Sequence, residues 1–271
     1  MESVERRSDG GSTRKRWLGS AVPIAVLLTA ILAAAALAHP QVVRVGNLIL
    51  RHDGGIIPNS LPRHEQAPVS AFVSAALSTT DGSHLPAAKR VVVDLDRSIH
   101  FNAAGLPVCK PAQLEARTTA AAKSACRDAI VGGGKAEVEV AFPEQAPFSA
   151  SGPLVLFNGG VHGKTTLLYI HAYVAVPAPT ALVATVKLSP MHHGQLGTHT
   201  VTTVPMIAGG AGSATKFRLT IGRRFTQPGG RKASYLTASC PTGHYSFEGE
   251  VLFADGTSLG LHNILPCIPK G

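Results

Sequence analysis

Residues 105–140 read GLPVCKPAQLEARTTAAAKSACRDAIVGGGKAEVEV, and this stretch is the best starting point for interpreting the chain. Pro111 suits the first turn of a helix, where its missing N–H would have no partner. The residues that follow are mostly strong helix formers, without Gly or Pro, as far as Ala129. Glycines are typical of helix ends, and Gly132–Gly134 follow directly. The sequence therefore predicts one helix over residues 111–129.

Two cysteines lie near the ends of this helix. Cys109 precedes it and Cys126 lies in its last turns. A helix rises about 1.5 Å per residue, so the chain around Leu106-Pro107 must fold back along the helix for the two to bond. The chain has four cysteines in all, and an even number in an exported chain indicates two disulfides. Of the three possible connectivities we favour Cys109–Cys126 and Cys240–Cys267, as structural staples.

The remainder of the chain has the pattern of short strands separated by Gly, Pro and Asn/Asp-Gly turns. Arg90–Arg97, for example, alternates apolar residues with Asp94 and Asp96, which places the two carboxylates on one solvent face. Glu137 and Glu139 alternate in the same way. Strands are expected at 41–51, 69–77, 90–97, 136–141, 153–157, 166–176, 181–188, 198–206, 215–221, 233–240, 245–253 and 257–262. The predicted fold is mainly β, an antiparallel β-sandwich or jelly roll with one disulfide-stapled helix.

The N-terminal residues have the pattern of an export signal. A basic patch at Arg14–Arg16 precedes an apolar run, and Ala36-Leu37-Ala38 is an A-x-A cleavage pattern. The apolar stretch is also long enough to span a bilayer, so a retained membrane anchor remains the alternative. We therefore expect residues 1–38 to be a signal or anchor and residues 39–68 to form an N-terminal strand and a Pro-rich covering loop. Residues 69–271 would form the β-sandwich domain, delivered to the cell surface or the medium.

Several short patterns are similar to a group of exported bacterial proteins without an assigned function. They are the GLPxC and CxxAxVGxG patterns that begin at Gly105 and Cys126, FNG at 157–159, YxxAxCPxG from Tyr235, FADG at 253–256, and the late Cys267. The resemblance covers most of residues 69–267. It implies an exported β protein, and it supplies no catalytic residues.

Residues 158–165, NGGVHGKT, are one residue short of a nucleotide-binding P-loop, because Asn158 stands where the first Gly belongs. A P-loop needs a helix after it, whose N-terminus faces the phosphate. The residues that follow here are β-branched and aromatic, as in a strand. We therefore interpret Asn158-Gly159-Gly160 as a hairpin turn and expect no nucleotide binding at Lys164.

Histidines offer two hypotheses for a metal site. His192, His193 and His199 form the densest group, and His193 and His199 could meet across a turn. Cleavage after Ala38 would also expose His39 as an N-terminal amine plus imidazole. With one more histidine, His39 would form a copper brace, as in exported copper oxygenases and copper carriers. A copper-binding protein or copper oxidoreductase is therefore the alternative function, and no other cofactor is expected.

The balance of charge favours an anionic partner. The chain carries 25 Lys and Arg against 16 Asp and Glu, a formal charge of +9, and loss of the leader would leave +7. Six cations fall within 17 positions: Lys216, Arg218, Arg223, Arg224, Arg231 and Lys232. A solvated charged ribbon is the simpler interpretation, and a site for an anionic envelope polymer or lipid surface is the functional one. The sequence has no G-x-S-x-G nucleophile elbow. We therefore expect a binding or structural protein of the cell envelope or medium, with no nucleotide or nucleic-acid partner.

Overall fold

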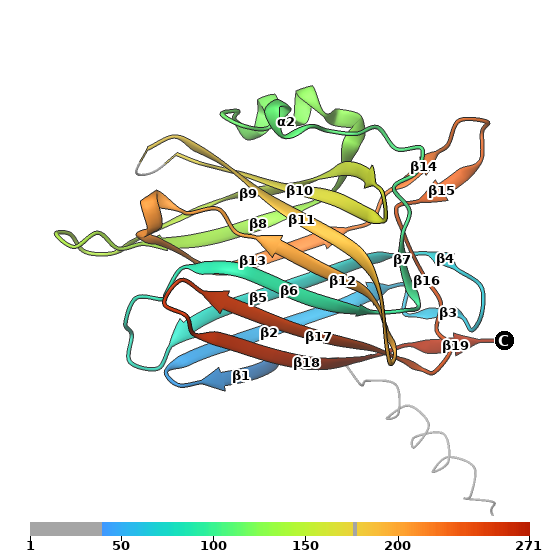
Figure 1. Ribbon diagram of the computed structural model, residues 1–271, viewed down its shortest axis with the longest axis horizontal. Coiled ribbons are helices and arrows are strands. Elements are labelled where there is room, and N and C mark those ends of the chain that lie inside the picture. Colours follow the sequence, from blue (N-terminus) through green and yellow to red (C-terminus); the bar gives the residue numbers. More distant parts are fainter. Residues whose placement is uncertain (1–39, 176–177) are drawn as a thin grey trace, which may run out of the picture. The chain divides into compact units, whose positions relative to one another are not determined.

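The computed structural model describes residues 40–175 and 178–271 (Figure 1). The predicted export signal or anchor at 1–38 and the predicted copper ligand His39 lie outside these residues. Within the described ranges, no helix combines the length and hydropathy needed to cross a bilayer.

Strands make up most of the described chain. The elements in order are β1 (Gln41–Val45), β2 (Leu48–Ile57), β3 (Ser60–Pro62), β4 (Ala67–Pro68), β5 (Ser70–Thr79), β6 (Ala88–Asp96), β7 (Ile99–Phe101), η1 (Pro111–Gln113), α2 (Thr119–Ala125), η2 (Arg127–Ala129), β8 (Ile130–Val140), β9 (Phe148–His162), β10 (Thr165–Val174), β11 (Thr180–His193), β12 (Leu196–Thr203), η3 (Ala208–Gly210), β13 (Gly212–Ile221), β14 (Arg224–Thr226), β15 (Lys232–Ser234), β16 (Leu236–Ala238), β17 (His244–Phe253), β18 (Ser258–Pro266) and β19 (Ile268–Lys270). The expected mainly β class is confirmed, and the main sheet is antiparallel throughout.

Twelve strands form one continuous sheet in the order β1-β2-β5-β13-β8-β9-β10-β11-β12-β6-β17-β18. The sheet curls until its two edge strands come together, where the Gln41 side-chain amide donates to the Asn263 side-chain oxygen at 2.8 Å. The main sheet is thus a near-barrel, and the predicted two-sheet sandwich is corrected to a single bent sheet. Twist between neighbouring strands accumulates over so many strands, and the register shifts within β10, β11 and β12 add further bending.

The interior of this sheet is filled by apolar side chains from opposite walls. Leu48 and Leu50 of β2 pack in one buried cluster with Phe253 and Leu259 from the β17–β18 hairpin. A second cluster joins β8, β9, β10 and β11 around the fully buried Tyr235. Segment 39–68, expected as an N-terminal strand and covering loop, contributes β1 and β2 to the main sheet.

The predicted helix over 111–129 is wrong in its length. Three short helical pieces replace it, and only α2 is an α-helix. Ala116 takes a left-handed backbone conformation (φ 54°), which reverses the chain between η1 and α2. Thr118 then starts α2, since its hydroxyl accepts the Ala121 N–H. The reversal that the disulfide requires therefore occurs here and not at Leu106-Pro107. We call residues 105–129 the helical cap.

Gly132–Gly134 do not end a helix, as the sequence had suggested, but lie inside β8. A Cβ atom at Gly134 would overlap the carbonyl oxygen of Arg218, and one at Gly132 would overlap that of Thr220. These glycines therefore permit the close approach of β8 to β13.

Candidate anion-binding face

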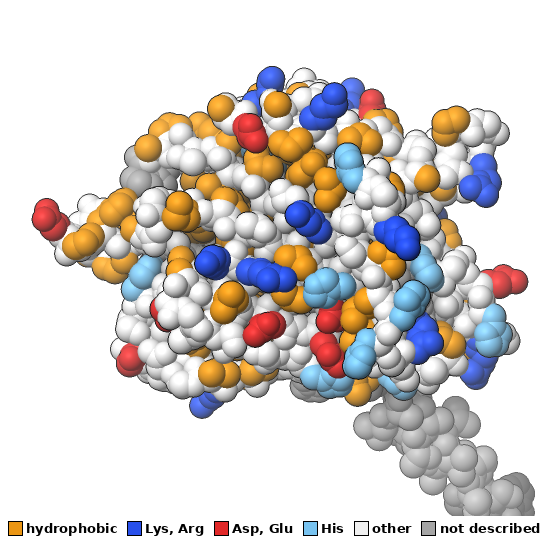
Figure 2. Space-filling model, viewed as in Figure 1, with side chains coloured by type: hydrophobic (Ala, Val, Ile, Leu, Met, Phe, Trp, Pro, Cys, Tyr) orange, Lys and Arg blue, Asp and Glu red, His pale blue; other side chains and the backbone are white. Residues whose placement is uncertain are grey.

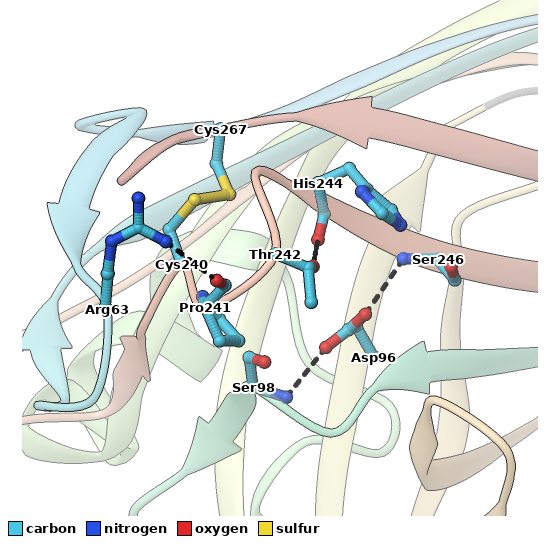
Figure 3. The surroundings of a disulfide bond; sticks show 9 residues. All are labelled: Arg63, Asp96, Ser98, Cys240, Pro241, Thr242, His244, Ser246 and Cys267. Carbon is cyan, nitrogen blue, oxygen red and sulfur yellow. Dashed lines mark hydrogen bonds between the residues drawn. A yellow bond between two sulfur atoms is a disulfide. The ribbon is translucent and has the colours of Figure 1, made fainter. Parts of the chain in front are cut away.

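Both predicted disulfides are present. Cys109 and Cys126 have Cα atoms 5.5 Å apart and close the helical cap. Cys240 and Cys267 have Cα atoms 6.1 Å apart and join the chain after β16 to the end of the chain (Figure 3). No free cysteine occurs in the described chain. Two disulfides are consistent with an oxidising, extracellular environment.

Around the second disulfide, the polar groups hold backbone together (Figure 3). The Asp96 carboxylate accepts the backbone N–H of Ser98 at 2.8 Å and that of Ser246 at 3.0 Å. Arg63 donates to the Pro241 carbonyl at 3.3 Å. Asp96 is therefore buried, whereas the sequence had placed it on the same solvent face as Asp94. This region is structural, and it offers no exposed catalytic carboxylate.

The outer face of β2, β5, β13 and β8 gathers cations that are far apart in the sequence. On β13, Lys216 and Arg218 share this face, as the alternation predicted. Strand register places Glu137 beside Lys216 and Lys135 beside Arg218, both on β8. The opposite neighbours on β5 are small, namely Ala76 and Ser74. Beyond Ala76 on β2 lies a fourth cation, Arg51, and beyond Ser74 lies an acidic residue, Asp53. We call Arg51, Lys135, Lys216 and Arg218 the basic face.

Two of these cations oppose each other without compensation. Lys135 and Arg218 are exposed cross-strand partners, and like charges in this position destabilise a sheet. Lys216 forms a loose ion pair with Glu137 (3.8 Å), but no ion pair of the described chain includes Lys135 or Arg218. The Arg218 guanidinium lies over the Phe72 ring, 5.9 Å from its centroid, which holds the charge in place. A single phosphate, sulfate or carboxylate group between the two cations would relieve their repulsion.

The other four predicted cations lie elsewhere. Arg223 donates from one guanidinium nitrogen to the carbonyls of Asp128 (2.7 Å) and Ile130 (2.8 Å), so it anchors the end of the helical cap. The remaining three lie between the expected strands 215–221 and 233–240 and are exposed on the β14–β15 hairpin: Arg224, Arg231 and Lys232. The predicted ribbon is thus divided between a sheet face, a structural contact and a separate hairpin.

Histidines do not cluster as the metal hypothesis required. His199 lies opposite Ser189, whereas His193 lies opposite Leu196, so the two do not meet across the turn. His199 bonds to Asp94 at 2.6 Å, and on the same outer face His262 approaches Glu248 at 3.9 Å. Within residues 40–175 and 178–271, no three His, Cys, Asp or Glu side chains form a group that could hold a metal ion. The copper brace at His39 stays a prediction, and His192 is exposed and belongs to no such group.

A serine, a histidine and a carboxylate also meet on β8 and β13, which the sequence did not reveal. The imidazole of His84 bonds to Glu139 at 2.7 Å through Nδ1 and lies 3.4 Å from the Ser213 hydroxyl through Nε2. The Ser213 hydroxyl donates to the Leu85 carbonyl at 2.5 Å, and only 1% of the residue is exposed. A serine nucleophile needs its proton directed to the histidine and an open face. This group therefore fastens the loop before β6 and is not a hydrolytic site.

The P-loop-like segment belongs to a hairpin, as predicted, but its turn lies at Gly163-Lys164. Asn158 lies within β9 and is fully buried. Its amide donates to the carbonyls of Leu106 (3.4 Å) and Pro107 (3.1 Å), and its oxygen accepts the Gly160 N–H (3.1 Å). The segment therefore anchors the helical cap, and no helix follows it as a P-loop requires.

Buried His171 of β10 is a second anchor of the cap. Its Nε2 donates to the Arg117 carbonyl at 3.0 Å, next to the chain reversal. Burial lowers the pKa of His171 below its ordinary value, although the bond to Arg117 opposes this shift. A neutral ring is thus favoured beneath the cap.

No protein-family model, no curated protein and no solved structure matches the chain.

Proposed function

We propose that this protein is an exported, non-enzymatic binding protein of the cell envelope or medium, which binds anionic groups through its basic face. The observation that carries the proposal is the exposed pair Lys135–Arg218. Folding stability alone would favour a carboxylate opposite Arg218, as Glu137 stands opposite Lys216. An uncompensated pair of this kind is expected where a surface binds an anion.

The shape of the basic face suits an extended or planar ligand. On β5, Ala76 lies between Lys216 and Arg51, and Ser74 lies between Arg218 and Asp53, so small side chains separate the charges of β13 from those of β2. Each exposed cation contributes only about 1 kcal/mol near an anionic surface. Binding should therefore be multivalent, and salt should weaken it because screening acts over about 8 Å at physiological ionic strength.

The test is cosedimentation of the full chain with an anionic polymer, polyphosphate, and with phosphatidylglycerol vesicles, at low and high salt. Replacing Lys135 and Arg218 together with Gln should weaken binding by about 30-fold, from about 2 kcal/mol at 1.4 kcal/mol per tenfold change. The matched control replaces Arg224 and Lys232 with Gln, which removes the same charge from the hairpin and should leave most of the binding. The two probes distinguish a polymer from a lipid surface. If both variants lose the same affinity, binding depends only on net charge, and a specific role of the basic face is refuted.

A further inference from the structure

The hairpin between β8 and β9 projects from the end of the molecule (Figures 1 and 2). Residues 141–148 read AFPEQAPF, and the rings of Phe142 and Phe148 lie 6.4 Å apart within it. The single charge of this segment is the exposed Glu144. We call residues 141–148 the tongue. Phe142 and Phe148 are half-buried, whereas Pro143, Ala146 and Pro147 are exposed. Exposed apolar groups that project from a domain are typical of an interaction site.

An apolar groove lies beside the base of the tongue, where the Ala141 N–H donates to the Ala211 carbonyl at 2.9 Å. The groove has a volume of about 260 Å³. Most of its lining is aliphatic, from the start of β6 and the loop between β12 and β13. Met206 belongs to this lining and is 78% exposed. Lys89 is the charged residue among the groove-lining side chains that the structure describes.

We propose that the tongue of one copy of this chain docks into the groove of a second copy. The groove is large enough for a phenylalanine side chain, and its aliphatic lining matches the Phe142–Phe148 pair. The charges are complementary as well, because each tongue carries Glu144 and each groove carries Lys89. Neither residue takes part in an ion pair within the described part of the chain.

The positions of the tongue and the groove favour a dimer with two-fold symmetry. Both lie at the same end of the molecule, joined through the Ala141–Ala211 bond. A two-fold axis at this end would let each copy insert its tongue into the groove of the other, so that both apolar surfaces are covered at once. Such isologous dimers are the commonest closed assemblies. No residue of the basic face lies in this contact, so the absence of a dimer would leave the proposed anion binding unaffected.

Sedimentation equilibrium of the full chain should show a dimer that dissociates on dilution. Glu144→Lys and Lys89→Glu should each weaken it by about tenfold or more, because each places like charges together in the complex. The double variant, Glu144→Lys with Lys89→Glu, should recover most of the affinity, since the pair is restored with its signs exchanged. A monomeric wild type, or a double variant as weak as the single ones, would overturn the proposal.

Chemical cross-linking gives an independent test of the contact. In a mixture of ¹⁴N- and ¹⁵N-labelled protein, carbodiimide should join Glu144 of one isotope to Lys89 of the other. Phe142→Ser with Phe148→Ser should abolish both this cross-link and the dimer, while circular dichroism shows the fold intact. Cross-links confined to single-isotope molecules would place the contact within one chain and contradict the dimer.

Discussion

Replacing Asn158 with Asp tests whether the helical cap depends on one buried amide. The two side chains have nearly the same shape, so packing is kept and only the hydrogen-bond donors are lost. Leu106 and Pro107 would then present their carbonyl oxygens to a carboxylate that cannot donate to them. A buried polar group left without its partner costs about 1–3 kcal/mol, so two such groups cost about 4 kcal/mol. Burial of an unpaired charge adds to this penalty.

Urea unfolding under non-reducing conditions, followed by circular dichroism, would measure the loss. Asn102→Asp is the matched control, because Asn102 is exposed and donates through the same amide nitrogen to Ser234 and Thr237. We expect this control to change the free energy of unfolding by about 0.5 kcal/mol or less.

The pH dependence of the Asp variant gives a further check. Burial disfavours the charged carboxyl, so the folded variant should bind a proton more tightly than the unfolded chain does. The difference in the free energy of unfolding between wild type and the Asp variant should therefore become smaller as the pH falls. If Asn158→Asp lies within about 1 kcal/mol of wild type at neutral pH, Asn158 does not anchor the cap and our account of this segment is wrong.

Three further changes test other parts of the fold. Because burial lowers the pKa of His171 from 6.5, the unfolded chain takes up a proton before the folded one. Thermal unfolding at a series of pH values should thus show stability falling below about pH 6.5, with a shallower slope in His171→Gln. Gly134→Ala should destabilise by several kcal/mol or prevent folding, because its Cβ would overlap a carbonyl of β13. Gly133→Ala should cost far less, because its nearest contact is 3.2 Å away, and urea midpoints would compare the two. Replacing Cys109 and Cys126 with Ser should cost about 3 kcal/mol for the 17-residue separation, and an unchanged urea midpoint would contradict this.

The candidate site was only partly predictable from the sequence. Lys216 and Arg218 share a face because strand alternation has a period of two, which is a local property. Their neighbours Lys135 and Arg51 could not be found in this way, since cross-strand register joins residues about 80 and 165 positions apart. Arg223 looked like a member of the same cluster, yet its side chain reaches the carbonyls at the end of the cap.

The sequence by itself determined the mainly β class, most of the strands and the pairing of the four cysteines. These depend on short-range features: apolar alternation, Gly and Pro at turns, and the nearness in sequence of Cys109 to Cys126 and of Cys240 to Cys267. Only the tertiary structure decided that the sheet bends until its two edge strands approach each other and that the helix breaks at Ala116. It also decided that the three glycines after the cap belong to a strand. Helix propensities differ by at most about 1 kcal/mol per residue, apart from proline. A steric overlap with a neighbouring strand, or a buried polar group without its hydrogen bond, destabilises the fold by more than this. Distant contacts therefore overruled the local preference of residues 111–134.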